Sequence, residues 1–222
     1  MRILIVSDAW YPQVNGVVRA LDTTRAHAEA AGHTVEVIGP DRFRTVAAPT
    51  YPEIRLALRP RGTLARLVEA FVPDAIHVAT EGPLGWAARA YCRRHGLPFT
   101  TSWHTMFPHY VRARFGVPLA WTFAFLRRFH RAGTRIMVTT PTMEAMLGGR
   151  GFRRIVRWRR GVDLDLFRPR DKGFLDFPRP IFVFVGRVAV EKNLDAFLSL
   201  ELPGTKMVVG DGPQAAELRR RY

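Results

Sequence analysis

The fold is indicated most clearly by residues 180–195, Pro-Ile-Phe-Val-Phe-Val-Gly-Arg-Val-Ala-Val-Glu-Lys-Asn-Leu-Asp. Residues 181–185 are an unbroken run of branched and aromatic side chains, which predicts a strand covered on both faces, as in a parallel α/β sheet. Gly186 ends the run, and a helix is expected from residue 193. Arg187 and Lys192 lie between strand and helix, where open α/β sheets bind ligands. They fit either a pyrophosphate clamp or a solvated turn with two surface cations.

Composition indicates a globular chain with affinity for phosphate. The 222 residues are 47% hydrophobic and 24% charged, enough for one large domain or two small ones. Lys and Arg number 34 against 19 Asp and Glu, a formal charge of +15 that favours nucleotides, anionic lipids or nucleic acid as partners. The single cysteine, Cys92, excludes an internal disulfide.

Apolar and polar residues alternate along the chain as they do in repeated βαβ units. No apolar run approaches the roughly 20 residues that span a bilayer, and residues 1–7 are too short for a signal peptide. We therefore expect a cytoplasmic protein, with peripheral attachment to the inner face of the cell membrane left open. The expected strands are residues 3–6, 33–38, 54–58, 73–78, 98–103, 135–139, 155–158, 181–185 and 206–209. The expected helices are residues 17–31, 63–71, 84–95, 119–131, 142–147, 194–200 and 214–221.

Residues 161–180 carry three prolines among charged residues, a composition typical of an inter-domain connection. We predict an α/β protein with a Rossmann-like parallel-sheet domain over residues 1–165. A second Rossmann-like domain begins at residue 166, and two strands with two helices are too few to stand alone. The chain is therefore expected to be a fragment, cut within its second domain.

Two stretches near strand ends could contact a substrate. Gly16 opens the first helix, so its backbone amide faces the region above the sheet, and Asn15 is suited to cap that helix. His104 follows the strand 98–103, a position that favours substrate contact over a purely structural histidine.

Three further patterns allow both a functional and a structural interpretation. Asp163 and Asp165 could bind a divalent cation, but we interpret them as a turn in the connection and predict no metal. Gly210-Asp211-Gly212-Pro213 is either a tight turn, with Pro213 at the first helical position, or a close approach to a nucleotide. Residues 112–131 interleave arginines with aromatics, which suits an anionic membrane surface or, more commonly, packing on the sheet.

Taken together, these motifs resemble Glycosyltransferase family four, the retaining enzymes of GT-B fold that use nucleotide-sugar donors. The branch looks nearest to GDP-mannose-dependent α-mannosyltransferases and to sulfoquinovosyl- or glucosyl-diacylglycerol synthases. The motifs lie in the family's order along nearly the whole chain. They are Tyr11-Pro-Gln-Val-Asn-Gly-Val-Val18, Trp103-His-Thr105, Arg160-Gly-Val-Asp163, Gly186-Arg187 with Glu191-Lys192, and Gly210-Asp-Gly-Pro213.

The resemblance implies catalytic roles for His104, Arg187 and Lys192. Arg187 and Lys192 would bind the donor diphosphate, and His104 would contact the transferred sugar. The donor side would also include Gly16, Gly210 and Gly212, and the acceptor side Tyr11, Asn15 and His104. The resemblance implies no tightly bound cofactor and no metal.

The implied reaction moves a hexose, mannose favoured, from GDP-mannose or a UDP-sugar to a lipid or glycan acceptor with retention at the anomeric carbon. The family's Glu-x₇-Glu motif would follow Tyr222, so residues 1–222 alone are expected to lack transferase activity. The alternatives are a UDP-sugar-dependent glycolipid synthase and a non-catalytic remnant that binds acceptor or anionic membrane. A nucleic-acid-binding protein is suggested by charge alone, and we expect no nucleic-acid partner.

Overall fold

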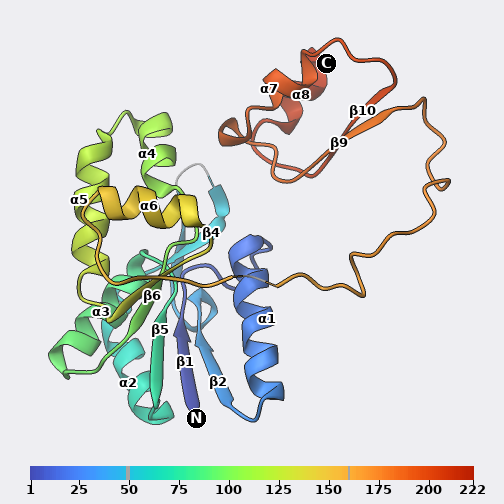
Figure 1. Ribbon diagram of the computed structural model, residues 1–222. Helices are drawn as coiled ribbons and strands as arrows, with labels where there is room; N and C mark the ends of the chain where they lie inside the picture. The colour runs from blue at the N-terminus through green and yellow to red at the C-terminus, as the bar shows by residue number, and fades with distance from the viewer. Residues whose placement is uncertain (49–50, 160) are drawn as a thin grey trace. The chain divides into compact units, whose positions relative to one another are not determined.

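The computed structural model describes residues 1–48, 51–159 and 161–222, and of residues 51–53 the backbone alone. The chain divides into two compact units, Met1–Gly161 and Val162–Tyr222, whereas the sequence predicted a division at residue 165. Arg160 of the Arg-Gly-Val-Asp motif lies outside the described residues. Both units are α/β, as predicted (Figure 1).

Unit 1 is built on a six-stranded parallel sheet with the strand order β2-β1-β5-β6-β7-β8. Its strands end at one edge, the carboxyl edge, because parallel strands all run in the same direction. The predicted strands of this sheet are confirmed, with shifts of one to a few residues at their ends. They are β1 (Arg2–Val6), β2 (Thr34–Ile38), β5 (Ala75–Val78), β6 (Thr100–Ser102), β7 (Arg135–Val138) and β8 (Ile155–Arg157).

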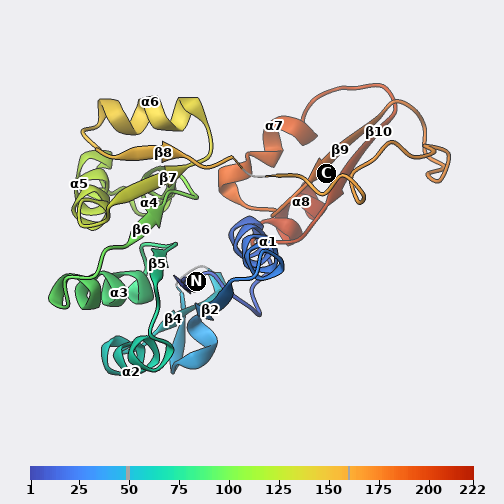
Figure 2. The same cartoon turned by 60° about the horizontal axis from the view of Figure 1, so that its bottom comes forward.

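Helices pack on both faces of this sheet because successive strand residues point to opposite sides. On β1, Leu4 and Val6 join the apolar cluster formed with α2 (Arg61–Phe71) and α3 (Pro83–Arg94). Ile5 faces the other way and packs with Leu21 of α1 (Gly16–Ala30). Figure 2 shows α1 on one side of the sheet and α2 and α3 on the other.

The remaining helices of unit 1 cover the half of the sheet that contains β6 and β7. Trp103, Phe123 and Ile136 belong to one cluster with side chains of α5 (Leu119–His130) and α6 (Pro141–Gly149). The sequence did not predict α4 (Phe107–Phe115), nor the 3₁₀ turn η1 (Pro40–Arg42).

The predicted strand at residues 54–58 is confirmed, but it does not belong to the parallel sheet that the βαβ pattern indicated. This stretch lies in β4 (Tyr51–Ala57), which pairs with β3 (Thr45–Ala48) as a separate antiparallel sheet. A short link lets neighbouring strands pair antiparallel, whereas a parallel pair needs a crossover of a dozen or more residues.

Unit 2 contains β9 (Ile181–Val185) and β10 (Thr205–Val209), paired in parallel. Its core is a small cluster that includes Phe184, Leu194 and Leu218, the last two from α7 (Leu194–Leu198) and α8 (Ala215–Arg221). The prediction that β9 is covered on both faces is wrong, because Val183 and Val185 are 50% and 73% exposed. Phe184 alone of these three turns to the helices, so within the described chain one face stays open.

Candidate active site

The carboxyl edge of unit 1 gathers polar residues from three neighbouring strands. Ser7 and Asp8 follow β1, Thr80 and Glu81 come shortly after β5, and His104 lies two residues beyond β6. Since β1, β5 and β6 are adjacent, these side chains come from one stretch of the edge. Open α/β sheets bind ligands at this edge.

Asp8 is a buried carboxylate that joins β1 to the start of α3. Its Oδ1 accepts from the amide of Leu84 at 2.8 Å, and its Oδ2 accepts from the Thr80 hydroxyl at 2.8 Å and the amide of Gly85 at 3.2 Å. Burial raises the pKa of Asp8, although these hydrogen bonds act in the opposite sense. Sequence reasoning missed Asp8, whose signal was its place directly after a buried strand.

His104 is held by a hydrogen-bonded chain of side chains. Ser102 Oγ donates to the carbonyl of Ala79 at 3.1 Å and lies 2.7 Å from His104 Nε2 and 3.1 Å from His77 Nε2. A hydroxyl has one proton, so Ser102 accepts from both imidazoles, and Nδ1 is the acceptor nitrogen of neutral His104.

His77 completes the chain and stays neutral. Its Nδ1 lies 2.8 Å from Thr100 Oγ1, and burial lowers the pKa of His77 to about 4. A neutral imidazole with Nε2 protonated accepts from Thr100 and donates to Ser102, consistent with the assignment for His104.

A second pair, missed from the sequence, lies beside this chain. His130, fully buried at the end of α5, places Nε2 3.1 Å from Glu81 Oε1 and Nδ1 2.9 Å from Thr101 Oγ1. Glu81 carried a signal, its place after β5, whereas nothing local marked His130. The pair fixes the Glu81 carboxylate at the carboxyl edge.

The loop before α1 serves mainly to start that helix. Asn15 Oδ1 accepts from the amides of Val17 and Val18 at 2.9 and 3.1 Å, which confirms the predicted cap. The exposed Tyr11 donates its hydroxyl to Asp22 of α1 at 2.8 Å. A Cβ built on Gly16 would meet no atom within 4 Å, so the space at this helix start is open.

In unit 2, the loops after β9 and β10 are packed backbone to backbone. The amide of Val188 donates to the carbonyl of Asp211 at 2.9 Å, which extends the parallel pairing beyond the strands. A Cβ on Gly210 would lie 1.9 Å from the Gly186 carbonyl oxygen, and one on Gly212 would lie 2.3 Å from that of Val188. Both glycines are therefore required by the neighbouring loop.

Arg187 and Lys192 both lie on the loop that joins β9 to α7. Arg187 is half-buried next to the glycine that ends the strand, and Lys192 is exposed at the end of the 3₁₀ turn η2 (Val190–Lys192). The expected helix therefore begins as a 3₁₀ turn, with α7 following from Leu194. Pro213 precedes α8 by two residues, so its prediction as the first helical residue is wrong.

The aspartates of the connection form a turn, as interpreted from the sequence. Asp163 Oδ1 accepts from the amides of Asp165 and Leu166 at 3.0 and 2.9 Å. Within residues 1–48, 51–159 and 161–222, no three His, Cys, Asp or Glu side chains are grouped to hold a metal ion. Cys92 is a core thiol, and burial raises its pKa to about 11. In that same part of the chain, every helix is too short or too polar to cross a bilayer.

Comparison with known proteins gives one family. The model of a family described as Glycosyltransferase Family 4 matches residues 14–166. A GDP-mannose-dependent alpha-mannosyltransferase from Mycobacterium tuberculosis (strain CDC 1551 / Oshkosh) is 31% identical over 99% of this chain. A sulfoquinovosyl transferase from Arabidopsis thaliana is 26% identical over 81% of it.

The fold has counterparts among solved structures. Sucrose-phosphate synthase from Thermosynechococcus elongatus aligns with 99% of this chain and 66% of its own, with a TM-score of 0.70 and 20% identity. The chain spans 65% of the length of the mycobacterial relative and 38% of the plant one. The structural likeness agrees with the predicted GT-B fold class.

Proposed function

This chain belongs to Glycosyltransferase Family 4, and we propose that the protein transfers a hexose, mannose in first place, from a nucleotide diphosphate sugar to a lipid or glycan acceptor. The observation that carries this proposal is similarity over 99% of the chain to three proteins named GDP-mannose-dependent alpha-mannosyltransferase. The resemblance drawn from the sequence motifs is thereby confirmed at the level of the family. The donor, the acceptor and the stereochemistry belong to the proposal.

In unit 2, Arg187 and Lys192 bind the donor diphosphate. Both are cations on the loop after β9, and the backbone beneath that loop is fixed by its close contact with residues 210–212. Charge-assisted hydrogen bonds from such cations stabilise the leaving nucleoside diphosphate as negative charge develops on it. Because Gly210 and Gly212 have no side chains, the backbone at these positions lies near the nucleotide.

In unit 1, His104 contacts the transferred sugar. Its Nε2 donates to Ser102, which orients the imidazole at the carboxyl edge of the sheet. Gly16 leaves open space for phosphate at the start of α1, and Tyr11 and Asn15 belong to the acceptor side. We propose retention through same-face displacement assisted by the leaving phosphate, with neither a metal nor a tightly bound cofactor.

The donor is tested by assaying the full-length protein, rather than residues 1–222 alone, with GDP-mannose and UDP-glucose in parallel, using extracted lipids and glycans as acceptors. We expect a mannosylated product from GDP-mannose, and NMR should show that its glycosidic linkage is α, as in the donor. Transfer from UDP-glucose instead would favour the glycolipid-synthase alternative. Absence of transfer with every donor would favour a remnant that only binds acceptor or membrane.

The assigned cations are tested by Arg187→Gln and Lys192→Gln. Each is expected to lower kcat/KM about 100-fold, the scale of losing one stabilising donor. Arg219→Gln, on α8 of the same unit, removes one exposed cation of the same kind and serves as control. Equal loss in all three variants would contradict a specific role for the β9–α7 loop.

Peripheral attachment to an anionic membrane forms part of the proposal, with the protein on the cytoplasmic side. On α5, Trp121 and Phe125 are 72% and 49% exposed and lie on one helical face with Arg128. Sedimentation with phosphatidylglycerol vesicles, but not with phosphatidylcholine, is expected and should weaken in Trp121→Ser. Phe174→Ser, at an exposed aromatic of unit 2, is the matched control; equal effects would count against α5.

A further inference from the structure

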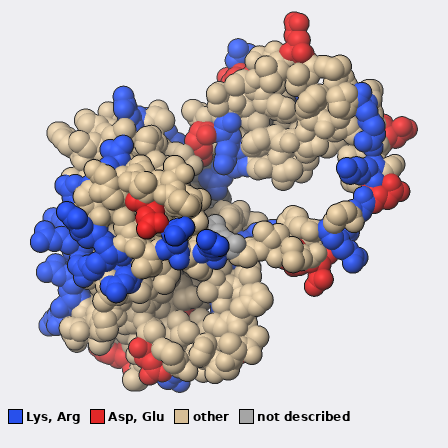
Figure 3. All heavy atoms as spheres, in the orientation of Figure 1, with Lys and Arg blue, Asp and Glu red and all other residues tan. Residues whose placement is uncertain are grey.

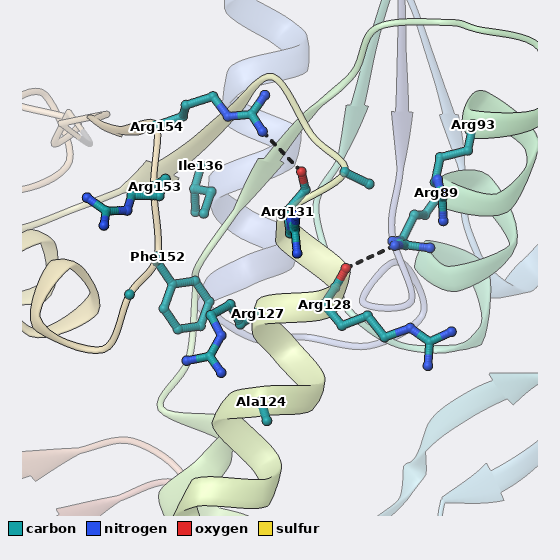
Figure 4. A pocket seen from close by; sticks show the side chains of 12 residues that line it. Arg89, Arg93, Ala124, Arg127, Arg128, Arg131, Ile136, Phe152, Arg153 and Arg154 are labelled. Carbon is teal, nitrogen blue, oxygen red and sulfur yellow. Dashed lines mark hydrogen bonds between the residues drawn. The ribbon is translucent and has the colours of Figure 1, made fainter.

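Unit 1 contains a polar groove of about 830 Å³ on its outer helices, which we call the arginine groove. Figure 4 shows it between α3, the end of α5 and the chain that leads into β8. Its arginines come from these three segments: Arg89 and Arg93; Arg127, Arg128 and Arg131; Arg153 and Arg154. On the face shown in Figure 3, Lys and Arg side chains gather densely over this side of unit 1.

The groove has an excess of positive charge that the protein itself does not neutralise. No acidic side chain lines it, and among the described residues none of its arginines pairs with a carboxylate. Elsewhere in unit 1 the pattern differs, since Arg25 pairs with both Asp22 and Glu29. Burial and the neighbouring Arg93 and Arg128 lower the pKa of Arg89, so the like charges repel one another. An anion in the groove would relieve that repulsion.

Part of this arginine set is held rigidly by backbone carbonyls. Arg89 donates to the carbonyls of Phe129 and Arg128 at 3.1 and 2.9 Å, and Arg154 donates to that of Arg131 at 3.2 Å (Figure 4). These bonds fix two guanidinium groups across the groove before any ligand arrives, which lowers the entropic cost of binding.

Arg127 donates to the carbonyl of Arg150 at 3.0 Å, whereas three other arginines of the groove keep their donors available. In the chain as described, Arg93, Arg131 and Arg153 are exposed, and their guanidinium groups have neither a hydrogen-bond nor an ion-pair partner. The guanidinium fork matches phosphate oxygens two at a time. Phe152 and Ile136, both buried, supply an apolar floor.

We propose that this arginine groove is a binding site for the phosphate groups of an anionic ligand, separate from the site of sugar transfer. Arg131 precedes β7, and Arg153 and Arg154 immediately precede β8, so they lie toward the amino ends of strands. His104 and Glu81 lie at the opposite, carboxyl edge. A soluble polyphosphorylated compound and a phospholipid headgroup offer the same chemistry, and the recessed shape of the groove favours a discrete phosphate cluster over an extended polyanion.

The test measures binding of inorganic tripolyphosphate by calorimetry and, separately, binding of phosphatidylglycerol vesicles by sedimentation. The groove variant is Arg93→Gln with Arg131→Gln, and Arg153→Gln alone is the milder variant. The control is Arg61→Gln with Arg66→Gln, which removes two exposed charges from α2. Lys192→Gln is included because phosphate could also bind at the proposed donor loop.

Tripolyphosphate binding about 100-fold weaker in the groove variant, about tenfold weaker in Arg153→Gln and unchanged in the α2 control would support a soluble phosphate ligand. Loss of binding in Lys192→Gln alone would assign the phosphate to the donor loop and overturn the proposal. The same dependence seen with vesicles alone would support a lipid headgroup. Equal loss in the α2 control, or no loss in Arg153→Gln and the groove variant, would overturn the proposal. Duplex DNA bound more tightly than either probe would also overturn it. Since binding is measured directly, these outcomes do not depend on whether sugar transfer is found.

Discussion

The two units hold their strand-end residues in different ways. In unit 1, side chains hold the strand ends: Asp8 accepts from two backbone amides of α3 and from the Thr80 hydroxyl, and Ser102 joins two histidines. In unit 2, backbone binds backbone, with Gly210 and Gly212 pressed against the β9 loop. The first arrangement fixes the protonation and direction of an imidazole. The second fixes only the path of the chain and leaves Lys192 in solvent.

The difference suggests a division of labour. A sugar hydroxyl needs a partner in one direction, which a hydrogen-bonded histidine provides. The negative charge of a diphosphate is distributed over several oxygens, which cations can approach from many directions. A lysine with a flexible side chain on a fixed loop is therefore sufficient to bind it. Substitutions can test whether unit 1 depends on its side-chain hydrogen bonds and unit 2 on its close backbone contacts.

The largest effect is expected for Gly210→Ala. The added Cβ would fall on the Gly186 carbonyl, so the two loops must separate, at a cost of about 4 kcal/mol in the stability of unit 2. Hydrogen exchange of β9 and β10 amides, read by mass spectrometry, measures this loss. Gly16→Ala is the comparison, because its Cβ meets open space. Similar destabilisation at both sites would break the contrast between the units.

The next effect is expected for Asp8→Ala. Loss of the carboxylate leaves the amides of Leu84 and Gly85 and the Thr80 hydroxyl without their acceptor, and unit 1 should lose about 3 kcal/mol. Urea unfolding followed by Trp fluorescence gives the free energy of unfolding. Asp22→Ala, which breaks a partly exposed ion pair with Arg25, should cost under about 1 kcal/mol. An equal cost in both would argue against the Asp8 cap.

Ser102→Ala should act on His104, in addition to the stability cost of leaving the buried His77 Nε2 and the Ala79 carbonyl without their partner. Without the hydroxyl, His104 Nε2 and His77 Nε2 lose their shared partner, and we expect about a tenfold lower kcat with KM little changed. ¹⁵N NMR of the imidazoles should also show His104 leaving the Nε2-protonated form. Ser199→Ala, on the exposed end of α7, should alter neither. If the variant retains both the His104 tautomer and the wild-type kcat, Ser102 does not position His104.

The last prediction concerns pH. In the folded chain the pKa of His77 is lowered to about 4, whereas an unfolded histidine titrates near about 6.5. Below the latter value the unfolded state binds more protons, so stability falls as pH drops from about 6.5 to about 4, by about 1 kcal/mol per pH unit. Urea midpoints across this range measure the slope. His77→Gln should flatten it; an unchanged slope would mean that other groups cause it.

Sequence patterns predicted what depends on neighbours in the chain. The run of residues 181–185, the Asn15 cap and the turn at Asp163 are local, and all three are confirmed. The main failure, residues 54–58, concerned the strand's partner: an apolar run does not say whether it pairs with β3 or with the large sheet. The motif order was informative enough to identify the family.

The candidate site was only half visible because its contacts join distant segments. Asp8 meets Leu84, and His130 meets Glu81, through pairings that only the folded sheet creates. The glycines at positions 210 and 212 were noticed, but their close neighbour proved to be the loop after β9. The sequence indicated only part of the arginine groove, as the basic end of residues 112–131, since Arg89 and Arg154 reach the groove from other elements.

The most direct test of the proposed division of labour is a ¹H–¹⁵N NMR titration of the chain with GDP. We expect GDP to shift the amide signals of residues 186–192 and 210–212, with an apparent Kd at least tenfold higher in Lys192→Gln and unchanged in Arg219→Gln. The arginine-groove variant, with Arg93→Gln and Arg131→Gln, should show the same shifts as the wild type. Saturating GDP that leaves residues 186–192 unperturbed, or perturbs them equally in Lys192→Gln, would contradict the assignment of diphosphate binding to unit 2.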